Sequence, residues 1–158
     1  MTTSATTAVP KPAPGGHAGS ADAFAKRLGY AGLAPFIVGA LLVWLVWPEA
    51  RPYVANGLSS YAAVIVSFLG AVHWGLAMRQ GRPAPRLYLW GVTPALVAWV
   101  AVVMPPYAGL VVHGVMLATC YAVDRKVYPA QGVSGWLKLR FRLSAVASLC
   151  CFVGAAGS

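Results

Sequence analysis

Five long apolar runs constrain this chain more than any other feature of its sequence. They are Tyr30 to Trp47, Leu58 to Met78, Leu87 to Met104, Tyr107 to Val123 and Trp136 to Ser158. A helix that spans a membrane needs about 20 mostly apolar residues, and the first four runs meet that need. Only 9% of the residues are charged, whereas soluble domains carry roughly 25%, so a soluble globular protein is excluded. The sequence predicts an all-α, polytopic bundle of five transmembrane helices.

The fifth run is weaker than the others because three basic residues fall at its start. Lys138, Arg140 and Arg142 leave only Leu143 to Ala156 free of charge. Long basic side chains reach toward the interface along the helix, which allows this helix to begin near Trp136. Four spans followed by a re-entrant or interfacial segment is the alternative.

The basic residues are distributed unevenly along the chain. If the N-terminus is cytoplasmic, the inner segments hold every Lys and Arg except Arg51. These eleven are Lys11, Lys26, Arg27, Arg79, Arg82, Arg86, Arg125, Lys126, Lys138, Arg140 and Arg142. The positive-inside rule then predicts a cytoplasmic N-terminus and a periplasmic C-terminus. The net charge of +9 is explained by this topology and by attraction to anionic membrane lipids, so no nucleic-acid partner is expected.

Residues 1–29 are rich in Ala, Thr, Pro and Gly and contain no apolar stretch. We expect a flexible cytoplasmic tail, not a secretory signal peptide, because the segment lacks an apolar region. Residues 30–158 then form the transmembrane domain.

No pattern in the sequence indicates catalysis, a cofactor or a metal. Cys120, Cys150 and Cys151 fall inside expected helices without a C-x-x-C spacing, which is typical of small apolar packing residues. A P-loop, a dinucleotide-binding glycine pattern and a nucleophile elbow are all missing. Asp22, Glu49 and Asp124 lie outside the apolar runs, so no carboxylate relay inside the membrane is predicted. We expect a protein that is not an enzyme.

The second run carries two packing faces. Its small residues Ala63, Ser67, Ala71 and Gly75 recur every fourth position, a pattern that lets another helix approach closely. At 100° per residue, His73 lies on the opposite face with Val66, Gly70 and Ala77. Because a histidine that faces lipid is costly, that face is also expected to be packed.

Two prolines, Pro35 and Pro94, lie near the expected depth of His73. Each frees the carbonyl four residues earlier, at Ala31 and Trp90. Freed carbonyls inside a membrane need new partners, which leads to the hypothesis of a small polar pocket for an anionic lipid headgroup or a quinone ring. Its residues would be His73, Trp74, Arg79, Arg86, Trp90 and Thr93, with Tyr121 also within reach. Helix kinks with internal hydrogen bonds are the alternative.

His73 and His113 raise the question of a shared haem. Counted from the ends of their runs at 1.5 Å per residue, the two differ by about 10 Å in height. A shared iron is therefore not expected, and each histidine is interpreted as structural, bonded to a backbone carbonyl or to a Ser or Thr hydroxyl.

Several stretches resemble a known family. They are Leu28-Gly29-Tyr30-Ala31-Gly32-Leu33-Ala34-Pro35-Phe36, Tyr61 to Ala77 with Ser67-Phe68-Leu69-Gly70 and His73-Trp74-Gly75, Trp90-Gly91-Val92-Thr93-Pro94-Ala95-Leu96, and Leu139-Arg140-Phe141-Arg142-Leu143. They are similar to an uncharacterised bacterial inner-membrane family (domain of unknown function 3429), itself similar to mitochondrial transmembrane protein 69. The resemblance implies an integral protein of the bacterial inner membrane and carries over no catalytic role.

Two functions are weighed on this basis. The favoured one is a non-catalytic accessory or assembly factor that packs against a larger, respiratory inner-membrane complex or against itself. The alternative is a small oligomeric carrier, or a lipid- or quinone-binding protein, that uses the pocket around His73.

Overall fold

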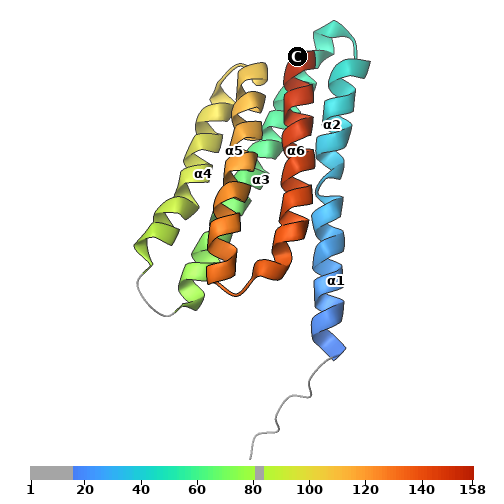
Figure 1. Ribbon diagram of the computed structural model, residues 1–158. Coiled ribbons are helices and arrows are strands. Elements are labelled where there is room, and N and C mark those ends of the chain that lie inside the picture. The colour runs from blue at the N-terminus through green and yellow to red at the C-terminus, as the bar shows by residue number, and fades with distance from the viewer. Residues whose placement is uncertain (1–15, 81–83) are drawn as a thin grey trace, which may run out of the picture.

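The computed structural model describes residues 16–80 and 84–158, and these residues form helices without strands (Figure 1). The helices are α1 (Gly16–Ala31), α2 (Ala34–Leu45), α3 (Arg51–Arg79), α4 (Pro85–Val103), α5 (Pro106–Ala130) and α6 (Leu137–Gly157), with short 3₁₀ turns at Pro48–Ala50 and Ser134–Trp136. Helices α2 to α5 each have a proline in the first turn, where no backbone N–H is needed.

Within the described residues, five segments are long and apolar enough to cross a membrane, which confirms the predicted five-helix bundle. They are Ala23–Leu45, Pro48–Arg79, Pro85–Val103, Pro106–Ala130 and Ser134–Gly157. The predicted boundaries differ most in three places: the first span begins at Ala23 instead of Tyr30, α3 begins at Arg51 instead of Leu58, and α5 continues to Ala130 instead of ending at Val123.

The first span consists of two helices. Helix α1 ends at Ala31 and α2 begins at Ala34, just before Pro35, so the proline breaks the helix here. Helix α1 begins at Gly16, inside the segment expected to be a tail, whereas residues 1–15 of that tail lie outside the described residues. The alanines of this segment favour a helix more than its overall polarity indicates.

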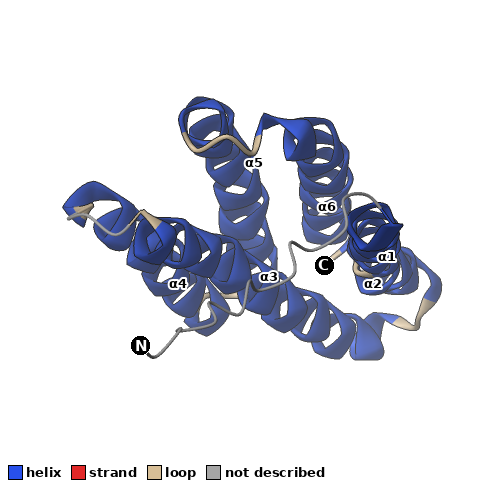
Figure 2. Cartoon of the chain, turned by 90° about the horizontal axis from the view of Figure 1, so that it is seen from below, coloured by secondary structure: helices blue, strands red, loops and turns tan. Residues whose placement is uncertain are grey.

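The C-terminal end of α3, the N-terminal end of α4 and the α5–α6 connection lie at one end of the bundle, the lower end in Figure 1. We call it the basic end because Arg79, Arg86, Arg125, Lys126 and Lys138 lie near it. Seen from this end, α1 and α2 lie on one flank and α4 on the other, with α3 extending between them (Figure 2). Helix α3 packs against α2, α4, α5 and α6 and is the central helix of the bundle.

The closest approach of α3 to α4 is made by two glycines. A Cβ atom added at Gly70 would lie 2.4 Å from the backbone oxygen of Gly91. The face that Gly70 shares with Val66, His73 and Ala77 is buried, as expected. The face formed by the small residues that recur every fourth position is less buried than the His73 face. Ala63 and Ser67 are half-buried, and Ala71 and Gly75 are exposed. Gly75 has no neighbour within 4 Å of an added Cβ, so the tight contact lies on the other face of α3.

Candidate functional site

A cluster of three polar side chains is buried between α3, α5 and α6. His73 comes from α3, Asp124 from α5 and Arg140 from α6. The side chain of Asp124 is 0% exposed, that of His73 1% and that of Arg140 13%. Ionisable groups at this depth in a transmembrane bundle are expensive and usually mark a functional site.

The two carboxylate oxygens of Asp124 have different partners. Arg140 donates to Oδ2 from Nε, at 2.8 Å, and also from Nη2. Oδ1 faces Nε2 of His73 at 3.3 Å, but the two atoms make no aligned hydrogen bond and neither has another partner among the described residues. On its other side, Nδ1 of His73 lies 3.3 Å from the backbone oxygen of Leu69. Both ring nitrogens of His73 therefore face oxygen atoms.

The two charged groups of the cluster balance each other. The guanidinium of Arg140 and the carboxylate of Asp124 sum to zero, the arrangement that a low-dielectric site favours. The pairing also explains why α6 spans although its start is basic: Arg140 is neutralised, Lys138 is exposed, and Arg142 donates to the hydroxyl of Tyr30 at 3.3 Å.

Two aromatic rings lie beside His73. The rings of Trp90 and Tyr128 each have centroids 6.5 Å from that of the imidazole. Nε1 of Trp90 is buried without a hydrogen-bond partner among the described residues. Tyr128 is close enough to Arg140 for the two side chains to interact. The cluster is thus enclosed by aromatic side chains on α4 and α5.

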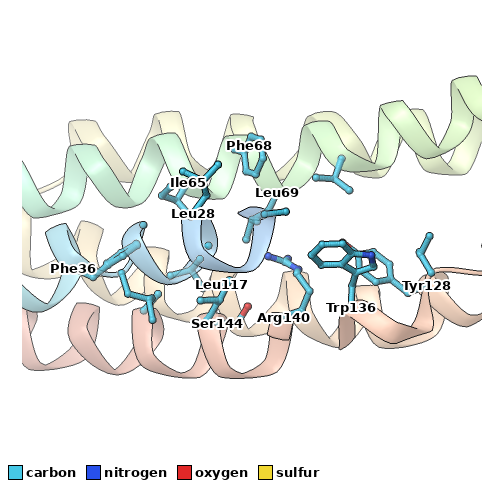
Figure 3. A pocket seen from close by; sticks show the side chains of 18 of the residues that line it. Leu28, Phe36, Ile65, Phe68, Leu69, Leu117, Tyr128, Trp136, Arg140 and Ser144 are labelled. Carbon is cyan, nitrogen blue, oxygen red and sulfur yellow. The ribbon is translucent and has the colours of Figure 1, made fainter. Parts of the chain in front are cut away.

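A cleft of about 600 Å³ lies next to the cluster, bordered by α1, α2, α3, α5 and α6. Figure 3 shows side chains that line it. Most are apolar: Ala25, Leu28, Gly29, Gly32, Leu33, Phe36, Ile65, Phe68, Leu69, Val72, Leu76, Leu117, Val133, Trp136, Leu143 and Ala147. The remaining three, Tyr128, Arg140 and Ser144, are polar. The volume falls within the range of pockets that bind small molecules.

The polar residues of the cleft are hydrogen-bond donors placed on one wall. Asp124 engages two of the five N–H donors of Arg140. Oγ of Ser144, one helical turn further along α6, is buried and has no partner among the described residues. In Figure 3 both side chains extend toward the space between the helices. The cleft therefore offers an apolar channel with a donor-rich wall, an arrangement that suits an amphiphile.

The structure brings together only part of the pocket predicted from the sequence. His73 and Trp90 are neighbours, but Trp74, Arg86 and Thr93 are exposed. Trp74 donates from Nε1 to the backbone oxygen of Tyr88, and Thr93 donates to that of Leu89. Arg79 is exposed and donates to the backbone oxygen of Gln131 on the α5–α6 connection. Tyr121 packs against Phe141, with ring centroids 5.3 Å apart.

A hydrogen bond joins the turn before Pro35 to another helix. The hydroxyl of Tyr61, on α3, donates to the backbone oxygen of Gly32 at 2.8 Å. This contact joins the α1–α2 turn to the central helix at the edge of the cleft, where Gly32 is a lining residue. The sequence analysis expected the carbonyl of Ala31 to need a new partner, whereas the carbonyl that accepts from Tyr61 is that of Gly32.

The position assigned to Asp124 was wrong. The sequence analysis ended the fourth apolar run at Val123 and left Asp124 outside it, yet α5 continues to Ala130 and buries Asp124. The spacing around the turn glycine could have identified Arg140 as the partner of Asp124. Asp124 and Arg140 each lie eight residues from Gly132, the turn glycine with a φ of 71°. In an antiparallel helix pair, residues equidistant from the turn lie at the same height.

His113 is also fully buried, on α5, and neither of its ring nitrogens has a hydrogen-bond partner among the described residues. It precedes Asp124 by eleven residues, which places it about 16 Å further along the helix. In residues 16–80 and 84–158 no three metal-ligating side chains come together. The two histidines thus occupy separate levels of the bundle.

Comparison with known proteins supports the resemblance seen in the sequence. The family described as "Protein of unknown function (DUF3429)" matches residues 21–156. Transmembrane protein 69 of Xenopus tropicalis is 37% identical over 131 residues, which cover 78% of this chain and 50% of that protein. Transmembrane protein 69 of Mus musculus is 23% identical over 126 residues, which cover 78% of this chain and 51% of that protein.

The chain thus spans about half the length of the curated relatives it matches. No solved structure matches it. Since the family match covers nearly all the described helices and the five spans agree with the membrane character of the relatives, this multi-pass membrane protein belongs to the DUF3429 family of proteins of unknown function.

Proposed function

We propose that the protein binds a membrane-dissolved amphiphile in the cleft between α1, α3 and α6. The observation that carries this proposal is the position of Arg140, which lines an otherwise apolar cleft while its guanidinium is held by buried Asp124. A guanidinium that Asp124 already holds in place is a preorganised donor for a ligand in the cleft. The apolar wall would hold the tail of the ligand and the polar wall its head.

The cleft has a route to lipid. Its α1 side consists of Ala25, Leu28 and Gly29, and its α3 side includes Phe68 and Leu76. Ala25, Leu28 and Phe68 are exposed, so this side of the cleft faces the surroundings of the bundle. A ligand would therefore enter sideways from the membrane between α1 and α3.

A single substitution tests the proposal. Ala25→Trp places a large side chain into the cleft, whereas Ala23→Trp puts the same side chain on α1 outside the lining residues. Each variant would be purified gently from its membrane and its bound lipids identified by mass spectrometry. We expect an enriched amphiphile with the unmodified protein and with Ala23→Trp, but not with Ala25→Trp. The same lipid profile in all three preparations would contradict the proposal.

A second candidate is the non-catalytic accessory role in a larger complex or in self-association. The stripe of exposed apolar side chains on α4 favours it: Leu89, Val92, Leu96, Trp99 and Val103. Their alternating spacing of three and four residues is the seam pattern of helices that pack together. In the same purification, a protein that co-migrates at fixed stoichiometry and is lost on Trp99→Ala would support this role. Migration of the protein without another chain would contradict it.

We also propose that the membrane is the bacterial inner membrane and that the N-terminus faces the cytoplasm. The excess of basic residues at one end of the bundle supports this orientation. Cysteine labelling from each side of sealed vesicles tests it. A cysteine introduced at Lys138, near the basic end, should react only from the cytoplasmic side, and one introduced at Glu49 only from the other.

A further inference from the structure

The polar wall of the cleft restricts which amphiphile it can take. We infer that the ligand is a membrane quinone: a flat, uncharged ring with two carbonyl oxygens on an apolar isoprenoid tail. This inference rests on the proposed binding function and specifies its ligand. Four features of the cleft carry it, namely charge, depth, donors and shape.

The charge of Arg140 is already balanced. Asp124 binds the guanidinium of Arg140 directly and is fully buried. A phosphate or carboxylate head on the cleft side of Arg140 would give one cation two anions and leave a buried negative charge. Such a charge is costly at this depth. An uncharged head that accepts hydrogen bonds adds no charge.

Ser144 also lies too deep along the last span for a phospholipid head. It is ten residues from Ser134, where that span begins, and the span ends at Gly157. At 1.5 Å per residue, Ser144 lies about 15 Å along the helix, near the middle of the span. A quinone ring is apolar enough to reach this depth, whereas a phosphate is not.

Ser144 supplies an unused donor. Its side chain is 4% exposed, its Oγ has no partner among the described residues, and it lines the cleft. A buried hydroxyl without a partner is destabilising unless a ligand or water completes it. Because Arg140 and Ser144 are one helical turn apart, they present donors at two heights. A ring with carbonyl oxygens on opposite edges can accept from both.

The aromatic residues of the wall fit a flat ring. Tyr128 and Trp136 line the cleft on the side nearest the basic end, and their side chains lie next to Arg140 in Figure 3. Aromatic faces stack favourably on planar rings. Further from the basic end, apolar side chains line the cleft, among them Phe36, Ile65 and Leu117. The tail of the ligand would lie there or leave between α1 and α3.

Binding of decylubiquinone, a short-chain quinone, tests the inference. The full chain would be placed in lipid nanodiscs, and bound quinone would be measured by its ultraviolet absorbance, with empty nanodiscs as the background. We expect saturable binding by the unmodified protein. Ser144→Ala should weaken it about two- to tenfold, the effect of losing one hydrogen bond. Ser148→Ala, whose hydroxyl donates to the backbone oxygen of Gly114 outside the cleft, should not change it.

Two comparison ligands separate the inference from the proposed function. Oleate is an anionic amphiphile, and diolein is a neutral one with ester carbonyls but no ring. If either binds in a manner that Ala25→Trp abolishes while decylubiquinone does not bind, the cleft binds amphiphiles and the quinone inference fails. If no ligand responds to Ala25→Trp, both fail. Quinone binding that Ala25→Trp abolishes but Ser144→Ala leaves unchanged overturns the assigned role of Ser144.

Discussion

Two buried histidines, His73 on α3 and His113 on α5, have opposite surroundings. The ring of His73 faces Asp124 and the backbone oxygen of Leu69, and it belongs to a cluster of which Arg140 lines a cleft. The ring of His113 has no hydrogen-bond partner for either nitrogen among the described residues. Both side chains are almost completely buried. Burial of a histidine in a membrane bundle therefore does not by itself mark a site.

The two regions differ in the space around them as well as in their polar partners. On α5, a Cβ added at Gly109 would meet the backbone oxygen of Ala101 at 2.3 Å, and one added at Gly114 would meet Phe152 at 2.9 Å. The residues around His113 are thus closely packed. Near His73, a Cβ added at Gly70 would make the same kind of tight contact with α4, while the cleft opens beside Arg140. The combination of a charged cluster with an adjacent cleft distinguishes the first region.

The largest effect is expected from removing the buried carboxylate. Asp124→Ala leaves the guanidinium of Arg140 without its partner inside the bundle, which costs about 3–5 kcal/mol for buried pairs. The thermal unfolding midpoint in detergent should fall steeply. Glu49→Ala is the matched control because Glu49 is an exposed acid at the other end of α3, and its removal should change stability by less than about 0.5 kcal/mol.

The double variant Asp124→Leu with Arg140→Met checks the reason for that loss. Replacing a buried ion pair by apolar side chains is often neutral, because the cost of desolvating both charges disappears. The double variant should therefore be more stable than Asp124→Ala. If it is equally unstable, the loss comes from packing around Asp124 and not from an unpaired charge.

Close backbone packing is expected to contribute similarly to stability around His73 and around His113. Gly70→Ala would push a methyl group against the backbone of Gly91, and Gly109→Ala would do the same against Ala101. Overpacking of this kind costs about 1–3 kcal/mol. Gly75→Ala is the control on the same helix as Gly70, since its Cβ meets nothing within 4 Å, and it should be neutral or stabilise α3. Equal melting temperatures for Gly70→Ala and Gly75→Ala would contradict the observed α3–α4 contact.

The two histidines should respond differently to the same substitution. His73→Leu puts an apolar side chain where the imidazole now lies 3.3 Å from both Oδ1 of Asp124 and the backbone oxygen of Leu69, at a cost of about 1–3 kcal/mol. His113→Leu removes two buried nitrogens that have no partners among the described residues, so stability should stay the same or rise. Thermal unfolding of the two variants side by side measures the difference. A larger loss of stability for His113→Leu than for His73→Leu would contradict the difference drawn between the two histidines.

The sequence predicted the architecture well because long apolar runs report directly on membrane-spanning helices. The five spans and the buried face of His73 on α3 were both expected, and both are observed. Hydropathy is less informative about helix ends. The fourth apolar run ends at Val123, before Arg125 and Lys126, yet α5 carries these two residues on its exposed surface and continues to Ala130.

The candidate site was only partly predictable because it depends on pairing between helices. His73 and Trp90 were chosen for their depth and are neighbours. Depth alone does not determine which way a side chain points, and Trp74, Arg86 and Thr93 are exposed instead. Asp124 and Arg140 were recognised as charges but not as a pair. Their pairing follows from the turn at Gly132, which aligns α5 with α6.

The smallest effects are expected from two serines one turn apart on α6, and they sharpen the contrast between the regions. Ser148 lies at the His113 end and donates to the backbone oxygen of Gly114 at 3.0 Å, so Ser148→Ala should cost about 0.5–1.5 kcal/mol. Ser144 lines the cleft with no partner for its Oγ among the described residues, so Ser144→Ala should leave the stability of the unliganded protein unchanged or raise it. Thermal unfolding without added quinone measures both. A loss from Ser144→Ala as large as that from Ser148→Ala would mean that the Ser144 hydroxyl already has a partner, and the donor would no longer be free for a ligand.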